Sequence, residues 1–363
     1  MRGYTTVETI EPYLSTGGRS RRVVHRFPNA TALLGPARHD KPMSSEPDSH
    51  RLALQAEVIA RRQGAEVGIG PDTMRSKVRN GRWQRLQRGV YAALSGEPTR
   101  ETELWAALLR AGPGAVLSHQ TAAERHGLID EPSSLITITV PASRSPARMK
   151  IPGIVIHRSD AILQTRHPAM LPPCTRVEDT VLDLIQTAAS FDDAYAWICR
   201  AIGRRRTTAD RIRHAMDARK KTRWRQELTV ALGDADDGVL SVLEYRYVHR
   251  VERPHGLPTA RRQARIGQRT GHRYLDNLYE EYGVCVELDG TAAHPADEQW
   301  RDKRRDNANA VRGIVTLRFG LPELGDRSCE AAADVAAVLR QHAWSGSLHP
   351  CARPTCWVRE GIS

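Results

Sequence analysis

Acidic residues in the last third of the chain have the types and spacing of a metal site. Glu287 and Asp289 follow an apolar alternation that begins at Val284, so on a strand both side chains project from one face. Asp276 lies on the preceding apolar segment, and Glu244 lies further upstream. Carboxylates that converge on one point are costly unless a cation neutralises them. Oxygen ligands suit Mg²⁺ or Mn²⁺, and such an ion can hold a phosphodiester and activate water.

A small α/β sheet must position these carboxylates. Alternating apolar residues predict strands over 274–279 and 283–290, and pairing of these strands would bring Asp276 beside Glu287. A helix that begins at Ser241 would bring Glu244 toward them. A buried strand over 314–319 and a closing helix complete the predicted sheet.

A basic segment near the N-terminus has the layout of a winged helix-turn-helix. A first helix, or two short ones, is predicted from Leu52 toward Val67, a basic helix opens at Pro71, and a ribbon follows over 82–91. Between 51 and 92, nine basic residues face three acids, which favours DNA over a solvated helical domain. The residues that we expect to contact DNA are Arg75, Lys77, Arg79, Arg82 and Arg85, together with Arg262 and Arg265 beside the acidic cluster.

The predicted fold class is an α/β multidomain protein. We expect a disordered extension over 1–42, a winged helix-turn-helix over 43–93, an α+β middle domain over 94–190, a basic helical linker over 191–235, a restriction-endonuclease-like domain over 236–343 and a tail over 344–363. Met43 is an alternative translation start, because the residues before it show no sustained apolar period.

Composition limits the class of function. The chain has 363 residues and a net charge of +12, and all but six of its 54 basic residues are arginine. This excess indicates either a nucleic-acid partner or the codon bias of a GC-rich genome. No apolar run approaches the length of a membrane span, and no secretory signal is evident, so we expect a cytoplasmic protein without a membrane partner.

Two further groups of residues have alternative interpretations. His349, Cys351 and Cys356 suggest zinc, but no fourth ligand is evident nearby, and Cys174, Cys199 and Cys329 are interpreted as core residues. Ser118 with His119 could belong to a hydrolase, although a helix cap at Ser118 is the favoured interpretation.

The C-terminal third resembles the endonuclease-like domain related to very-short-patch-repair nucleases, of the PD-(D/E)XK restriction-endonuclease-like fold. The residues that carry this resemblance are Glu244, Asp276, Glu287-Leu288-Asp289-Gly290, His294, Arg305-Asp306-Asn307 and Leu317-Arg318-Phe319. Residues 58–92, including Gly81–Leu86 and Gly89–Tyr91, resemble the N-terminal winged helix of AbiEi-type antitoxins. Residues 117–128 with 175–184 are similar to the middle of actinobacterial proteins built in this order.

The resemblance implies metal-dependent cleavage of DNA. Asp276 and Glu287 would be metal ligands, Glu244 would add a water-mediated ligand, and His294 would protonate the leaving oxygen or position water. Asp289 stands where the general fold pattern has lysine, which leaves the general base open; the related repair nucleases also lack that lysine, and Lys303 is a candidate substitute. The alternative is a non-catalytic DNA-binding regulator or antitoxin, with a toxin as its partner.

Overall fold

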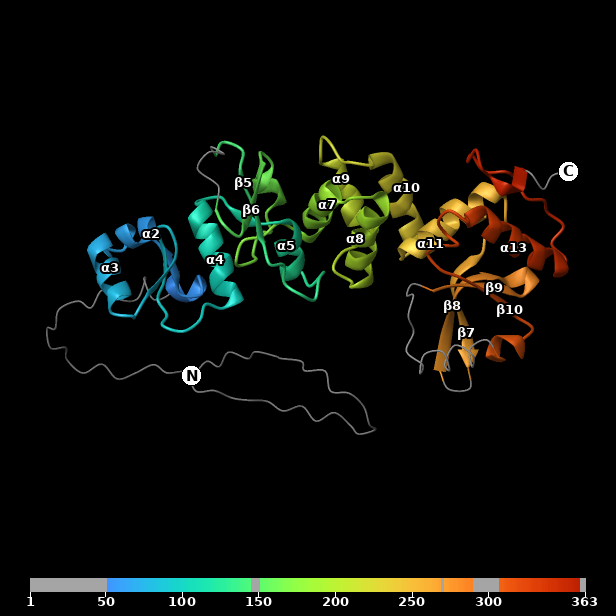
Figure 1. Cartoon of the computed structure of the whole chain (residues 1–363), viewed down its shortest axis with the longest axis horizontal. Coiled ribbons are helices and arrows are strands. Elements are labelled where there is room, and N and C mark those ends of the chain that lie inside the picture. The colour runs from blue at the N-terminus through green and yellow to red at the C-terminus, as the bar shows by residue number, and fades with distance from the viewer. Residues whose placement is uncertain (1–50, 145–150, 269–270, 290–306, 360–363) are drawn as a thin grey trace, which may run out of the picture. The chain divides into compact units, whose positions relative to one another are not determined.

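The computed structural model describes residues 51–144, 151–268, 271–289 and 307–359. The predicted extension over 1–42 and the alternative start at Met43 lie outside these residues. The described chain is a mixed α/β structure with three small sheets, whose elements are labelled in Figure 1. The coarse prediction of an α/β multidomain protein is therefore confirmed.

The first sheet joins three short strands around two helices. After a helical turn at residues 51–54, the elements are β1 (Val58–Ala60), α2 (Arg61–Glu66), α3 (Pro71–Arg79), β2 (Gln84–Gln87) and β3 (Val90–Ala92). The sheet order is β1-β3-β2, and its pairs are antiparallel. The prediction that Val58 and Ile59 are helical is wrong. Both are β-branched and almost fully buried, and they pair with Ala92 and Tyr91.

Close packing fixes α2 against α3. A Cβ added to Gly64 of α2 would lie 2.0 Å from the Cε atom of Met74, which is fully buried on α3. Pro71 opens α3 in its first turn, where a missing N–H group costs nothing, and Asp72 complements the positive end of the helix dipole. The apolar side of α3 therefore faces α2, which leaves its basic side outward.

A second sheet follows without a break in the core. The elements are α4 (Arg100–Ala111), β4 (Val116–Leu117), α5 (His119–Arg125), β5 (Ile136–Pro141), β6 (Ile154–Ser159), α6 (Ile162–Thr165) and α7 (Val177–Thr187). Strand β5 pairs antiparallel with β4 and parallel with β6. Leu104 and Leu108 of α4 share one apolar cluster with Val58 of the first sheet and Ile138 of the second. The predicted boundary near residue 93 therefore crosses a continuous hydrophobic core.

Three helices occupy the predicted basic helical linker, and they contribute to a hydrophobic core. Helices α8 (Phe191–Gly203), α9 (Ala209–Asp217) and α10 (Arg225–Asp236) pack with α7 around a core that includes Tyr195, Ile198 and Leu228. Arginines of this segment also pair within the chain, as Arg219 does with Asp179 and Asp183. The charge run hid an amphipathic pattern, because helices expose arginine on one side and bury aliphatic residues on the other.

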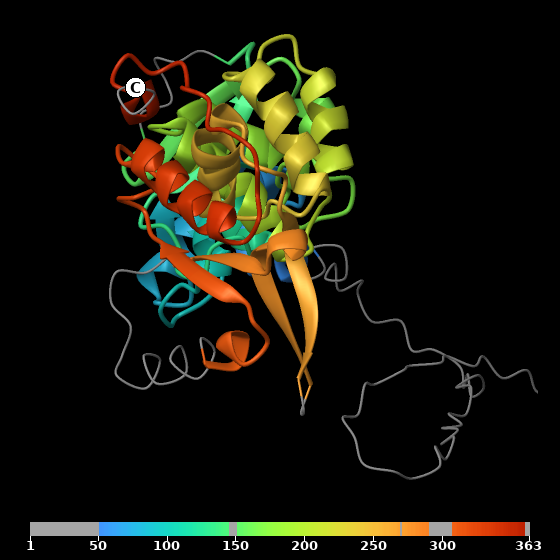
Figure 2. The same ribbon diagram turned by 90° about the vertical axis from the view of Figure 1, so that its right-hand side faces the viewer.

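The third sheet has four strands in the order β10-β9-β8-β7. Its elements are α11 (Val242–Arg246), the π-helical η2 (Tyr247–Glu252), the 3-10 turn η3 (Arg253–His255), β7 (Arg261–Gln268), β8 (Gly271–Tyr279), η4 (Glu280–Tyr282), β9 (Val284–Leu288), β10 (Val315–Phe319), α13 (Ser328–Gln341) and η5 (Trp357–Arg359). Strand β10 pairs parallel with β9, and the other pairs are antiparallel. Figure 2 shows the β7–β8 hairpin in orange and α13 in red.

One face of this sheet is apolar and covered by helices. Val284 and Val286 of β9 and Phe319 of β10 share a buried cluster with η2 and α13. The predicted tail contributes as well, because Cys351, Cys356 and Val358 are buried against Cys329 of α13. The helices thus cover the side of β9 opposite to Glu287. Among the described helices, none combines the length and apolarity needed to cross a bilayer.

Candidate functional site

The register of the third sheet brings Asp276 and Glu287 to one face. The β8–β9 ladder ends where Asn277 pairs with Val286, and Asp276 and Glu287 are the next residues on the two strands. Side chains that are directly opposite in such a ladder lie on the same side of the sheet. The backbone N–H of Leu288 donates to Oδ2 of Asp276 at 2.9 Å, which fixes this carboxylate against β9.

Glu244 joins the pair through Gln263. Oε2 of Glu244 accepts the backbone N–H groups of Leu240 and Ser241 at 2.6 and 2.9 Å, in a capping box with Ser241 at the start of α11. Its Oε1 accepts Nε2 of Gln263 at 2.6 Å, and the same nitrogen lies 3.4 Å from Oδ1 of Asp276. Glu244 thus has a capping function and a position beside Asp276 at the same time.

Gln263 was not singled out in the sequence. It lies in an arginine-rich stretch of β7, and its φ of +46° is in the left-handed region that non-glycine residues seldom adopt. The described β7–β8 ladder pairs Arg262 and Ala264 but not the residue between them. This local distortion turns one amide toward two carboxylates, an arrangement of the kind found at functional sites.

Burial and the nearby charge of Asp276 raise the pKa of both Glu244 and Glu287. Burial raises the pKa of Glu287, and the nearby Asp276 carboxylate raises that pKa further. Burial is also the largest cause of the raised pKa of Glu244, to which Asp276 adds. The charged forms of these two carboxylates are therefore destabilised, and a bound divalent cation would stabilise them.

Arginines compensate part of this negative charge. Arg273 donates to Oε1 of Glu287 at 3.0 Å, and Arg318 donates to Oδ1 of Asp289 at 3.1 Å. Asp289, which stands where the general fold pattern has lysine, therefore forms an ion pair with Arg318. The donor set of Asp276, Glu287 and Glu244 consists of oxygen atoms, as Mg²⁺ requires, so these residues fit the implied ion, with Arg273 as a competitor for one oxygen.

The two basic residues predicted beside the acids lie in different environments. Arg262 is partly buried, with a side chain 10% exposed, and it pairs with Glu252 and with Oδ1 of Asn277. Its guanidinium therefore holds the interior of the sheet together rather than facing a phosphate. Arg265, on the same strand, is exposed.

The predicted DNA-contacting residues of the first sheet lie mostly on the surface. Arg75, Arg79, Arg82 and Arg85 are exposed, and Lys77 lies over the ring of Trp83 at 4.8 Å. Arg75 pairs with Asp72, while Arg79, Arg82 and Arg85 form no ion pair with the described residues. Arg75 and Arg79 are four positions apart on α3, so they project from the same side of that helix.

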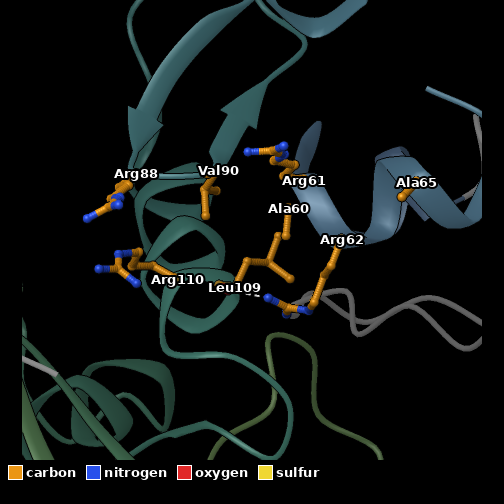
Figure 3. A pocket seen from close by; sticks show the side chains of 9 residues that line it. Ala60, Arg61, Arg62, Ala65, Arg88, Val90, Leu109 and Arg110 are labelled. Atoms are coloured by element: carbon orange, nitrogen blue, oxygen red, sulfur yellow. Dashed lines mark hydrogen bonds between the residues drawn. The ribbon is translucent and has the colours of Figure 1, made fainter. Parts of the chain in front are cut away.

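A hollow of about 440 Å³ beside β3 gathers arginines to which the sequence analysis assigned no role. Figure 3 shows Arg61 and Arg62 from α2, Arg88 from the β2–β3 turn and Arg110 from α4 around it. Arg62 donates to the Leu109 carbonyl at 2.9 Å, and burial followed by Arg144 lowers its pKa. The folded chain thus extends the basic surface to α4, which lies beyond the predicted winged helix.

His294 and Lys303 lie outside the described residues. Ser118 is the N-cap residue of α5, as predicted, but its hydroxyl makes no capping hydrogen bond and instead contacts Nδ1 of His119 at 3.0 Å and the Thr139 hydroxyl at 2.8 Å. Ser118 is fully buried, and burial lowers the pKa of His119 to about 3. A solvent-inaccessible hydroxyl is poorly suited to attack a substrate, which disfavours the hydrolase interpretation.

Comparisons with known proteins yield little. No protein-family model matches the chain, and no curated protein matches it. Among solved structures, it is similar to the crystal structure of the RV2827C protein from Mycobacterium tuberculosis, with 18% identity and a TM-score of 0.36, over 58% of this chain and 82% of that one. A similarity this weak carries no argument about function.

Proposed function

We propose that the protein hydrolyses phosphodiester bonds of DNA in a reaction that depends on Mg²⁺ or Mn²⁺. The observation that carries this proposal is the proximity of Asp276 to Glu287: Asp276 binds the N–H of Leu288 beside Glu287, and Gln263 links Glu244 to Asp276. Burial and the nearby Asp276 carboxylate raise the pKa of Glu244 and of Glu287, which favours a cation as the missing partner of these acids.

Asp276 and Glu287 would hold the ion. When bound, it would polarise the scissile phosphate and lower the pKa of a bound water. The neighbouring groups orient the ligands: the Leu288 N–H fixes Oδ2 of Asp276, and Gln263 holds Glu244 close to Asp276. Arg318, beside Asp289, brings positive charge to the same edge of the sheet, where a phosphate would be bound.

We propose that the first sheet binds the DNA as a winged helix-turn-helix. Its order of strand, helix, helix and antiparallel ribbon is that of the motif, with α3 as the recognition helix and β2–β3 as the wing. Exposed Arg75 and Arg79 on α3 and exposed Arg82, Arg85 and Arg88 around the wing support this assignment. The hollow at Arg61 and Arg110 would take backbone phosphates beside it.

Cleavage of supercoiled plasmid tests the enzymatic proposal. We expect nicking by the wild type with Mg²⁺ or Mn²⁺, and loss of nicking with EDTA and in Asp276→Ala and Glu287→Ala. Glu281→Ala is the matched control, because Glu281 is an exposed acid of the same domain. Inactive wild type, or equal nicking by all four proteins, would refute the proposal.

A second candidate function is DNA binding without cleavage, as a regulator or as an antitoxin with a toxin partner. Two ion pairs favour this function, Arg273 with Glu287 and Arg318 with Asp289. In both pairs an arginine neutralises a carboxylate whose charge a metal ion would otherwise neutralise. A mobility shift on the gene's own upstream DNA, together with repression and no cleavage in either metal, would favour this alternative. Cleavage that is lost in Asp276→Ala would exclude it.

A further inference from the structure

A second constellation lies apart from the acidic cluster, where the C-terminal segment meets α13. His255 ends η3, Cys329 lies in the first turn of α13, and Cys351 and Cys356 belong to the segment that follows. One ligand atom from each residue lies within 4.8 Å of the other three. All four residues are buried, and none of them has a part in the proposed cleavage.

Two of the six separations between the ligand atoms are close to the edges of a metal tetrahedron, and all six are within 4.8 Å. The Sγ atoms of Cys329 and Cys351 are 3.7 Å apart, and Sγ of Cys356 is 3.8 Å from Nε2 of His255. With Zn–S bonds of about 2.3 Å and Zn–N bonds of about 2.0 Å, tetrahedral geometry requires edges of about 3.5–3.8 Å. A disulfide would need sulfur atoms about 2.05 Å apart, and all six cysteines are free.

His255 presents the correct nitrogen. Its Nδ1 lies 2.9 Å from the Val251 carbonyl oxygen, which can only accept a hydrogen bond. Nδ1 therefore carries the proton, and Nε2 directs its lone pair toward Cys356. This is the usual arrangement around zinc, in which a backbone carbonyl fixes the tautomer and the orientation of a ligating histidine.

The surroundings suit thiolates. The backbone N–H of Cys351 points to Sγ of Cys356 at 3.3 Å, and Arg359 donates to the Cys351 carbonyl at 3.0 Å. Leu348 and Val358 pack against the cluster and limit access of water. Three thiolates and one Zn²⁺ carry a net charge of −1, and the nearby positive charge of Arg353 offsets it.

We propose that His255, Cys329, Cys351 and Cys356 bind one Zn²⁺ in a closed structural site. Four protein ligands leave no position for water, so this ion would have no catalytic role and would crosslink η3, α13 and the C-terminal segment. Sulfur-rich donors select Zn²⁺ over Mg²⁺ and Mn²⁺, which keeps this site distinct from the acidic cluster. Each thiol would lose its proton to solvent as its Zn–S bond forms.

This site replaces the one that the sequence suggested. His349 was the histidine considered with Cys351 and Cys356, but its ring packs on Gly256, where an added Cβ would lie 2.8 Å from Nδ1 of His349. The His349 N–H donates to the His255 carbonyl at 2.9 Å, so the C-terminal segment runs alongside the true candidate ligand. Cys329, interpreted as a core residue, supplies the fourth ligand.

Metal content of the full-length protein tests the proposal. After purification in reducing buffer without chelator, we expect one zinc ion per chain by elemental analysis. We expect this zinc to be lost in Cys356→Ser and in His255→Ala, and to be retained in the control Cys199→Ser, which removes a thiol outside the cluster. Wild type that contains no zinc and takes up none would overturn the proposal, as would equal zinc content in all variants.

Cobalt substitution keeps the test valid if a variant fails to fold. Wild-type protein stripped of metal and loaded with Co²⁺ should show thiolate-to-cobalt charge transfer and the intense visible bands of tetrahedral cobalt. Zinc added to the stripped protein below the thiol pKa should release three protons per ion. A cobalt spectrum without thiolate bands, or a Cys329–Cys351 disulfide in protein purified under reducing conditions, would refute the site. None of these readouts depends on DNA cleavage.

Discussion

Replacing Asp276 by asparagine should stabilise the metal-free protein while it removes the proposed metal site. Asparagine keeps an oxygen that can accept the Leu288 N–H, now at 2.9 Å, and gives up the longer 3.4 Å contact with Gln263. It also removes the charge that contributes to the raised pKa of both Glu287 and Glu244. Sites shaped for function commonly carry such unfavourable charge at the expense of stability.

The magnitude follows from the register. Cross-strand carboxylates about 5 Å apart repel by about 3 kcal/mol at an effective dielectric constant of about 20. Arg273, 3.0 Å from Oε1 of Glu287, offsets roughly half of this repulsion. Loss of the weak Gln263 contact costs about 0.5 kcal/mol, which leaves a gain of about 1 kcal/mol. For a domain of this size, that gain raises Tm by about 2–4 °C.

The raised pKa values of Glu244 and Glu287 predict how the stability of the wild type and of Asp276→Asn changes with pH. Groups whose folded pKa is raised contribute stability that is present below their unfolded pKa and is lost as pH rises through the folded value. Wild-type stability should therefore decline as pH rises above the ordinary glutamate range, and Asp276→Asn should decline less. The difference in Tm should be largest near neutral pH and should close in acid.

Thermal unfolding by calorimetry, without metal and then with Mg²⁺, measures both effects. We expect Mg²⁺ to raise the Tm of the wild type and to leave that of Asp276→Asn unchanged, because the ion stabilises only a folded state that binds it. Glu281→Gln, at an exposed acid, is the control for loss of one charge. A gain that is independent of pH, or that Glu281→Gln matches, would refute the proposed repulsion.

Other predictions concern the supports of the sheet and the basic surface. Arg262→Ala should destabilise the protein by about 3–5 kcal/mol in denaturant unfolding, because it leaves the charge of Glu252, which is 2% exposed, buried and uncompensated. Arg265→Ala on the same strand should change the free energy of unfolding by less than about 0.5 kcal/mol. Equal effects of the two substitutions would contradict the structural role of Arg262. Arg79→Ala with Arg82→Ala should lower the salt dependence of DNA affinity, the slope of log K against log salt, by about two, whereas Arg327→Ala with Arg340→Ala, which removes equal charge from α13 and its N-terminus, should leave it unchanged. Unchanged affinity in the first pair would refute α3 and the wing as the DNA-binding surface.

Sequence alternation was sufficient for the sheet that carries the acids. Val284, Val286 and Leu288 alternate with Cys285 and Glu287, so the apolar face of β9 and the direction of Glu287 follow from a period of two. Pairing of β8 with β9 was expected from their proximity in the chain. The orientation of Gln263 could not be expected, because its left-handed backbone depends on the tertiary structure around it.

Other elements were misinterpreted for identifiable reasons. Leu54 and Val58 have the i, i+4 spacing of a helical face, yet Val58 and Ile59 pair with β3 in a strand. For short apolar runs, tertiary context decides between helix and strand. In 191–235, the number of arginines obscured apolar positions such as Ile198 and Ile212 that form a core. The zinc ligand set was incomplete because His255 precedes Cys356 by 101 positions, a separation that no local spacing rule covers.

Binding of Mn²⁺ measured by electron paramagnetic resonance tests the central claim most directly. The free-ion signal should fall as the wild type takes up Mn²⁺ in a saturable way, and Asp276→Asn with Glu287→Gln should abolish this uptake. Loss of zinc in Cys356→Ser should leave Mn²⁺ uptake intact, because sulfur and nitrogen donors do not favour Mn²⁺. No saturable binding by the wild type, or equal binding by the double variant, would contradict a divalent-metal site at Asp276 and Glu287.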